Sequence, residues 1–185
     1  MKEVIGNVFD FISDVETNAI CITTNAMLRK NGNGIMGLGI ALECRNRYPE
    51  TEKYLGQMLK SRGNKLSVIG MTDHNGLFVK PYLDNYRQDL VVIFSFPTKY
   101  NWRDKSDLKL IEESCRYLVW YADGIKTVDL KGKKHGLDKI VLPVPGCNNG
   151  GLSYENEVRP LISSILDDRF VVCKRSENEE SAPDV

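Results

Sequence analysis

An asparagine and a glycine-rich run follow the first long apolar segment of the chain. The apolar segment is residues 19–22, Asn25 comes three positions later, and residues 31–41 read NGNGIMGLGIA. Closely spaced glycines leave backbone N–H groups open to a ligand, and a loop of this kind before a helix N-terminus commonly holds phosphate groups. The pattern therefore predicts a strand, a loop and a helix that together cradle a diphosphate.

Two other interpretations of these glycines compete with a diphosphate loop. Residues 32–37 match the GxGxxG pattern of dinucleotide-binding folds. In those folds the first glycine directly follows the strand, and an acidic residue about twenty positions later ends the next strand. Here a polar segment intervenes, and Glu50 and Glu52 fall where a helix is expected to begin. The dinucleotide fingerprint is therefore disfavoured, whereas glycines that serve only tight turns stay an open alternative.

A second glycine loop lies in the last third of the chain. Residues 142–152 read LPVPGCNNGGL and again run from an expected strand into an expected helix. Two such units in one domain predict two loops that close on one extended ligand, each contacting it mainly through backbone amides. This arrangement is typical of a cleft for a nucleotide diphosphate.

Lys99 is the side chain with the clearest catalytic potential. It follows the apolar run 91–96, and ligands gather where the strands of such sheets end. A deprotonated amine could take part in cleavage at an anomeric carbon if burial or a neighbouring cation lowered its pKa. A charged ammonium could instead stabilise a phosphate or a departing anion. An ordinary solvated lysine is the third alternative.

Short β-branched or aromatic runs alternate with helical patterns along the chain. Helical spacing of apolar residues is clearest over 107–122, and the pair Asn75 and Gly76 marks a hairpin turn. The alternation predicts a mixed, partly antiparallel sheet covered by helices on both faces. The expected strands are 4–5, 19–22, 66–71, 77–82, 90–96, 140–142 and 170–173, and the expected helices are 37–48, 51–62, 107–122 and 154–166.

Length and charge limit the classes of protein that fit this sequence. The 185 residues, 42% of them hydrophobic, suit one domain, which we expect over residues 1–175 with a disordered acidic tail over 176–185. Lys plus Arg and Asp plus Glu are equal at 25 each, so any contact with nucleic acid has to be local. One such place is the lysine-rich segment 126–139, for which a solvated loop is the alternative.

The cysteines and the N-terminus indicate a cellular compartment. Five scattered cysteines without CxxC spacing indicate reduced thiols rather than a metal site. The N-terminus lacks the apolar core of a secretory signal, and no apolar run is long enough to cross a bilayer. We therefore expect a cytoplasmic protein that needs no membrane, metal or redox cofactor, with a monomer as the default.

Taken together, these motifs resemble those of the macrodomains, which bind ADP-ribose and its derivatives. The resemblance covers residues 2–173 and rests on the order and spacing of five segments. They are ITTN at 22–25, IMGLGIA at 35–41, FPTKYNW at 96–102, SDL at 106–108 and the second glycine loop. The segment that contains Lys99 and the GCxNGGL loop are most similar to the DarG-like branch and, more distantly, to the human terminal ADP-ribose glycohydrolase.

The resemblance implies a three-layer α/β/α sandwich with a central mixed sheet and one ADP-ribose cleft. Asn25 matches the asparagine that bonds a distal-ribose hydroxyl, and Lys99 matches the lysine implicated in catalysis in this branch. Asn7 stands where many macrodomains carry an aspartate that accepts from the adenine amino group. The other ligand-binding residues are expected in the two loops and beside Lys99: Gly34, Ile35, Met36, Gly37, Leu38, Gly39, Thr98, Gly146, Cys147, Asn148, Asn149, Gly150 and Gly151.

The second glycine loop departs from the family pattern. The human relative pairs its lysine with an aspartate in this loop, whereas this chain has Asn148 and Asn149 there and no acid between Gly146 and Leu152. Asn148 also stands where this branch usually has glycine. The missing acid favours binding without turnover, whereas the retained lysine favours catalysis.

Two functions follow from the resemblance. The first is an enzyme that binds ADP-ribose derivatives and hydrolyses a bond at C1″ of the distal ribose. Its substrates would be ADP-ribosylated nucleic acid or protein, ADP-ribose 1″-phosphate or O-acetyl-ADP-ribose. The second is a non-catalytic module that binds ADP-ribose or sequesters a nucleotide derived from it.

Overall fold

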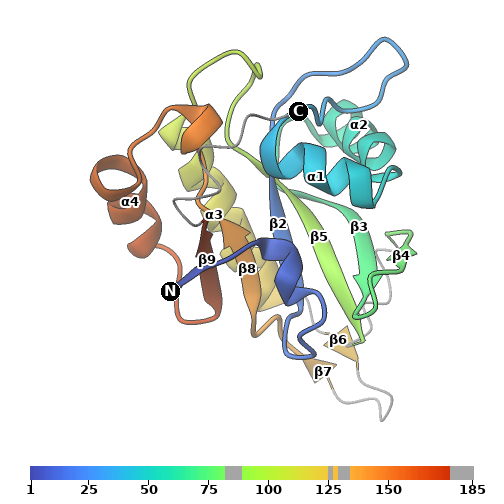
Figure 1. Ribbon diagram of the computed structural model, residues 1–185, viewed down its shortest axis with the longest axis vertical. Helices are drawn as coiled ribbons and strands as arrows, with labels where there is room; N and C mark the ends of the chain where they lie inside the picture. Colours follow the sequence, from blue (N-terminus) through green and yellow to red (C-terminus); the bar gives the residue numbers. More distant parts are fainter. Residues whose placement is uncertain (82–88, 125–126, 129–133, 176–185) are drawn as a thin grey trace.

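Seven strands form one mixed sheet at the centre of the molecule (Figure 1). The computed structural model describes residues 1–81, 89–124, 127–128 and 134–175. The five strands on one side of the sheet run parallel, and β3 is antiparallel to both of its neighbours. In spatial order the strands are β1 (Lys2–Ile5), β9 (Phe170–Lys174), β8 (Ile140–Pro143), β2 (Ala19–Thr24), β5 (Leu90–Pro97), β3 (Ser67–Asp73) and β4 (Phe78–Val79).

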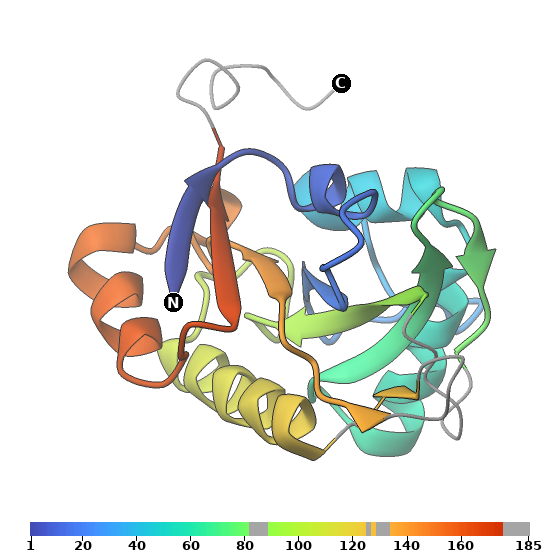
Figure 2. The same ribbon diagram turned by 90° about the horizontal axis from the view of Figure 1, so that it is seen from below.

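Helices cover both faces of this sheet. Figure 2 shows α1 and α3 on opposite sides of it. The first face carries a short 3-10 helix (Val8–Phe11), α1 (Gly39–Arg47) and α2 (Thr51–Arg62), and the second carries α3 (Leu108–Gly124) and α4 (Arg159–Ser163). The smaller elements are a 3-10 turn (Asn148–Gly150), a π-helical turn (Tyr154–Val158), and the strand pair β6 (Thr127–Val128) and β7 (Lys134–His135). The expected three-layer sandwich is confirmed.

The core consists of two apolar clusters, one on each face of the sheet. Strands of the parallel region are buried on both faces, so alternate residues of a strand serve different clusters. In β5, Phe94 and Phe96 pack towards α3, whereas Ile93 packs towards α1 and α2. The side chains of Cys21, Cys44, Cys115 and Cys173 are buried in these clusters. In the described part of the chain, no helix is long and apolar enough to cross a membrane.

Most of the expected elements are present at or near their expected bounds. Each expected strand is found, but the strand expected over 77–82 is reduced to Phe78–Val79, and residue 82 lies outside the described residues. The turn at Asn75 and Gly76 joins the antiparallel pair β3 and β4, and α2 has the expected ends. The expected helix 154–166 is wrong in detail because it opens as a π-helical turn and ends at Ser163. Pro160 near the start of α4 has no amide hydrogen to donate, which interrupts the regular helical pattern. The expected acidic tail lies outside the described residues.

The first glycine loop is held against α2 by close backbone contacts. The Gly34 N–H donates to the Glu52 carbonyl at 2.8 Å. A Cβ on Gly34 would lie 2.5 Å from the side chain of Leu55, and a Cβ on Gly56 would lie 2.1 Å from the Gly32 carbonyl oxygen. These glycines are therefore required for helix and loop to approach each other.

We expect the Gly56→Ala substitution to destabilise the fold. The added methyl group has to push the loop backbone away from α2, a strain of about 1–3 kcal/mol. Thermal unfolding measures the effect as a lower Tm. Gly124→Ala is the control, because a Cβ there has no atom of another described residue outside its own helix within 4 Å. A Tm for Gly56→Ala equal to that of the control would contradict the close packing.

Candidate functional site

A cleft of about 1350 Å³ lies at the carboxyl ends of the parallel strands. Its floor is formed by the last residues of β1, β2, β8 and β9 and by Thr98, which follows β5. Its walls are the two glycine loops, and Lys99 lies between them. A ligand site at this edge is typical of sheets with parallel strands.

The first loop presents unpaired amide groups to the cleft. Among the described residues, the backbone N–H groups of Gly37, Leu38 and Gly39 have no hydrogen-bond partner, and all three residues line the cleft. They lead directly into α1, whose N-terminus has no side-chain cap. Open N–H groups and the positive end of a helix dipole favour an anion at this position. A Cβ on Gly37 would meet only the Ile35 side chain, at 3.9 Å, so this glycine is not required for packing.

The second loop is shaped by residues in the left-handed conformation. Gly146 has a φ of 76° and packs so closely on α3 that a Cβ would lie 2.6 Å from Ile111. Asn148 has a φ of 53°, and asparagine tolerates this region better than most other side chains. This backbone conformation explains why either glycine or asparagine is suitable at position 148. The N–H groups of Asn148 and Asn149 have no partner among the described residues.

Lys99 links the second loop to the end of β5. Its Nζ donates to the Asn149 carbonyl at 2.8 Å and to the Trp102 carbonyl at 3.4 Å. The Lys99 carbonyl in turn accepts from Asn64 Nδ2 at 3.2 Å. Burial lowers the pKa of the Lys99 ammonium below its ordinary value, and the carboxylate of Asp104 opposes this shift. Lys99 is thus a lysine held at the cleft, not a freely solvated one.

Asn25 is buried, and one hydrogen of its side-chain amide is not used in a protein hydrogen bond among the described residues. Its Nδ2 donates to the Ile35 carbonyl at 3.1 Å, and its Oδ1 accepts from the Met27 N–H at 2.9 Å. These bonds hold the first loop to the end of β2. An amide nitrogen carries two hydrogens, so the second one is available to a ligand in the cleft.

Asn7 lines the cleft, but its side chain is held by its neighbours. Its Oδ1 accepts from the Phe9 N–H at 3.2 Å, and its Nδ2 donates to both carboxylate oxygens of Glu43, at 3.0 and 2.9 Å. The side-chain carbonyl therefore caps the 3-10 helix, and acceptance from an adenine amino group would use its second lone pair. The carboxylate next to Asn7 is therefore that of Glu43 on α1.

The other expected site residues divide into two groups. Gly34, Met36 and Gly151 do not line the cleft, and the Met36 side chain is fully buried in the core. The expected residues that do line it are Asn7, Asn25, Ile35, Gly37, Leu38, Gly39, Thr98, Lys99, Gly146, Cys147, Asn148, Asn149 and Gly150.

Several cleft residues were missed by sequence reasoning. The hydroxyl groups of Thr24 and Ser106 are buried at the cleft and have no partner among the described residues, although buried hydroxyls are normally hydrogen-bonded. Both belong to the segments that carry the family resemblance, which was the available signal. Tyr154 also lines the cleft, and it packs against the core cluster on the α3 side of the sheet. Lys174 and Arg175 line the cleft beside it.

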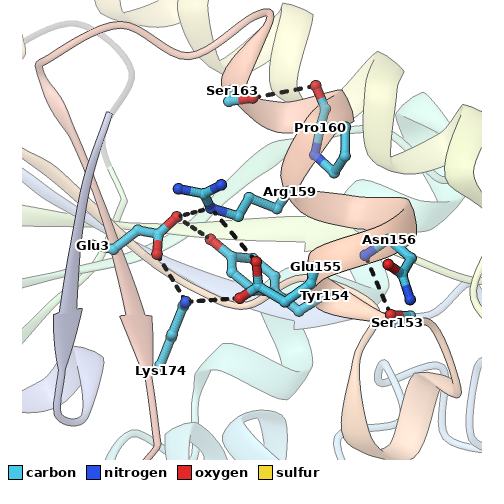
Figure 3. A network of polar contacts seen from close by, with 9 residues as sticks. All are labelled: Glu3, Ser153, Tyr154, Glu155, Asn156, Arg159, Pro160, Ser163 and Lys174. Carbon is cyan, nitrogen blue, oxygen red and sulfur yellow. Dashed lines mark hydrogen bonds and ion pairs between the residues drawn. The ribbon is translucent and has the colours of Figure 1, made fainter.

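A polar network around Glu3 builds the wall that contains Tyr154 (Figure 3). The Glu3 carboxylate accepts from the Tyr154 hydroxyl at 3.0 Å and from Arg159 Nε at 2.7 Å, and it lies 2.8 Å from Lys174 Nζ. The Lys174 ammonium also lies 4.4 Å from the centre of the Tyr154 ring. Burial alone would raise the pKa of Glu3, but these three donors outweigh it and lower the pKa to about 2.

The charged side chains of the cleft favour an anionic ligand. Among the described residues that line it, Arg29, Lys99, Lys174 and Arg175 are cationic, and Glu155 is the one carboxylate. No group of three or more His, Cys, Asp or Glu side chains in the described residues is placed to hold a metal ion. The arrangement suits a diphosphate held by backbone amides and cationic side chains.

Comparison of the sequence with known proteins finds relatives of one kind. No protein-family model matches the chain. The DNA ADP-ribosyl glycohydrolase of Thermus aquaticus is 27% identical over 137 residues, which is 74% of this chain and 32% of that protein. The DNA ADP-ribosyl glycohydrolase of Mycobacterium tuberculosis is 27% identical over 150 residues, which is 81% of this chain and 35% of that protein. The chain thus spans about a third of the length of these curated relatives.

Comparison with solved structures agrees with this result. The DarTG protein of Thermosipho africanus, solved in complex with ADP-ribose, aligns with a TM-score of 0.65 at 22% identity, over 98% of this chain and 43% of that one. The macrodomain of Thermus aquaticus DarG aligns with a TM-score of 0.62 at 24% identity, over 95% of this chain and 97% of that one. At these identities the structures establish the fold, and they confirm the macrodomain fold that the motifs predicted.

We expect Glu3→Gln to lower stability at neutral pH by about 1–2 kcal/mol, because three donors lose a charged acceptor. The folded-state pKa of Glu3, about 2, lies below its ordinary value of 4.5. The stabilisation is therefore complete above pH 4.5 and is lost as the pH falls from there towards 2. Thermal unfolding of wild type and variant across this window should show the two curves converging at low pH. Glu16→Gln, which removes an exposed carboxylate, is the control, and a constant difference at every pH would contradict the assignment.

Gly37→Val should fold normally and weaken the binding of a nucleotide diphosphate, the class of ligand that the two loops suit. ADP-ribose, the ligand of the solved Thermosipho africanus structure, is the probe. The new side chain meets open space in the protein but occupies the cleft beside the unpaired amides, which should weaken binding at least about tenfold. Isothermal titration measures the affinity, and thermal unfolding checks the fold. Gly124→Ala, at a glycine that does not line the cleft, is the control and should keep the affinity. Wild-type affinity in Gly37→Val would place the ligand elsewhere.

Proposed function

We propose that this chain, a macrodomain of the DarG-like branch, binds ADP-ribose in the cleft and hydrolyses the bond at C1″ of the distal ribose. The observation that carries the proposal is the position of Lys99 between two glycine loops, each of which has backbone N–H groups without a partner among the described residues. The loops suit the diphosphate, and a lysine with a lowered pKa suits proton transfer at the neighbouring ribose.

The names of the relatives support ADP-ribosylated nucleic acid as the substrate class. The curated relatives are named DNA ADP-ribosyl glycohydrolases, and the matched part is about a third of their length. The macrodomain structure of Thermus aquaticus DarG is covered almost completely by this fold. We therefore propose that the activity of this chain is removal of ADP-ribose from a nucleic acid base.

The proposed reaction follows from the groups at the cleft. Cleavage at an anomeric carbon develops positive charge on the ribose and negative charge on the departing group. The bond between C1″ and the departing group breaks, and the departing group takes a proton from the Lys99 ammonium, whose lowered pKa makes it a better acid. A water molecule adds to C1″ and releases a proton to solvent, from which the Lys99 amine is protonated again. Asn25 offers its second Nδ2 hydrogen to a hydroxyl of the distal ribose. The amides of both loops fix the diphosphate and so hold C1″ beside Lys99.

The set of carboxylates distinguishes this proposal from an ordinary glycosidase mechanism. Glycosidases use two carboxyl groups that flank the scissile bond. Glu155 is the one carboxylate among the described residues that line the cleft, and it hydrogen-bonds to Lys174 at the β9 end. With no acid in the second loop, the proton transfer is assigned to Lys99.

We expect Lys99→Ala to reduce turnover at least about 100-fold, because the departing group loses its proton donor. ADP-ribose should still raise the Tm of the variant by several degrees, since the amides that hold the diphosphate stay in place. The substrates to be compared are an ADP-ribosylated oligonucleotide, an ADP-ribosylated protein, ADP-ribose 1″-phosphate and O-acetyl-ADP-ribose. Lys53→Ala, which removes an exposed lysine of α2, is the control for charge.

Lys99→Arg separates the possible roles of the lysine. Arginine keeps the positive charge but does not release its proton, so the proposal expects it to be as inactive as the alanine variant. In the wild type, the rate should fall as the pH rises through the pKa of Lys99. A rate that rises instead, or a borohydride-trapped adduct on Lys99, would contradict the acid role. Binding of ADP-ribose without turnover of any substrate would identify a binding module, and no binding would exclude both functions.

A further inference from the structure

A groove of about 740 Å³ lies outside the cleft, between the C-terminal end of α2 and the exposed face of α3. Two aromatic side chains of α3 line it and are open to solvent. Tyr117 is 40% exposed and Trp120 is 63% exposed. The Trp120 ring packs edge-on against Tyr121 at 5.1 Å between centroids, which limits its rotation. The groove thus offers aromatic faces that are already oriented and uncovered.

Cationic side chains flank these aromatic rings. Arg62 and Lys65 line the groove from the α2 side, and Arg116 lines it from α3. Arg62 donates to the Tyr121 hydroxyl at 3.1 Å, and Arg116 pairs with Glu112 at 2.8 Å. Lys65 is exposed and has no ion-pair partner among the described residues. Among the described residues that line the groove, Glu113 is the one with an acidic side chain, so the lining has a positive charge in a chain without net charge.

The groove begins next to the catalytic end of the cleft. Asn64, which precedes Lys65, donates to the Lys99 carbonyl. The loop after Lys99 carries two more exposed aromatic side chains, Tyr100 at 56% and Trp102 at 40%. Trp102 lines the cleft, and the Arg103 guanidinium lies 4.6 Å from the centre of its ring. Aromatic and cationic groups therefore occur on both sides of Lys99.

We propose that the groove between α2 and α3 binds a single-stranded nucleic acid. Bases stack on Tyr117 and Trp120, and the phosphates pair with Arg62, Lys65 and Arg116. Single strands are specified because the bases of a duplex are stacked on each other and cannot cover an exposed ring. The proposal rests on the proposed function in one respect, namely that the same strand carries the ADP-ribosyl group held in the cleft. A groove for a peptide is the competing occupant.

The test uses the intact protein and unmodified, fluorescein-labelled oligo(dT) and oligo(U) of equal length, with binding followed by anisotropy. Each of Trp120→Ala and Tyr117→Ala should weaken binding roughly 5- to 150-fold, as expected for loss of one stacked base. With three phosphate contacts, log Kd should rise with log salt at a slope of about 2. Lys65→Gln should reduce that slope by roughly 0.7, whereas the matched variant Lys53→Gln should leave it unchanged.

The outcomes separate the groove from the cleft. ADP-ribose should stabilise the Trp120→Ala variant as much as the wild type, because Trp120 does not line the cleft. No saturable binding of either oligonucleotide at low salt, or equal affinity of wild type and both aromatic variants, would overturn the proposal and favour a peptide. If the oligonucleotides bind in the groove but ADP-ribose does not stabilise the protein, the proposed function fails and the groove stands.

Discussion

Close packing between glycine loops and helices is the constraint on which the rest of this structure depends. Amide groups stay open to the cleft only if other contacts hold the loop backbone in place. Gly34 and the buried Met36 fasten the first loop to α2 and the core, and Gly146 fastens the second loop to α3. At each of these glycines a Cβ would collide with a neighbouring side chain. Both loops are therefore held in place at the strand ends, with these N–H groups open to the cleft.

Lys99 connects the second glycine loop to the segment that follows α2. Its ammonium holds the Asn149 carbonyl of the second loop, and its own carbonyl is held by Asn64 at the end of α2. The side chain is thus fixed from both ends of the residue. Burial that lowers its pKa is a consequence of this position, since the same loops that hold a ligand also exclude water from the amine.

Local charge matters more than net charge in this protein. The chain is neutral overall, yet the described lining of the cleft has four cationic side chains and one carboxylate. At one end of the cleft, Glu3 orders Tyr154 and Lys174 through charged hydrogen bonds. Near Lys99, the exposed Trp102 ring lies beside the Arg103 guanidinium. An anionic ligand is therefore favoured locally, at the cleft, and not by the overall charge of the molecule.

Sequence reasoning by itself determined the elements and the two loops. Apolar periodicity, the turn at Asn75 and Gly76 and the order of the motifs are local properties, so they predicted the mixed sheet, its helices and the strand ends that meet at the cleft. They also placed Lys99 there, because a residue after a buried strand has few other positions to occupy.

Only the tertiary structure decided which way each residue faces. Met36 and Gly37 are neighbours in one run, but one fills the core and the other borders the cleft. Tyr154 packs partly against the core and also lines the cleft. The groove joins Lys65, which follows α2, to Trp120 of α3, more than fifty positions along the chain. Such facts depend on how two elements pack against each other, and no local pattern in either element contains that information.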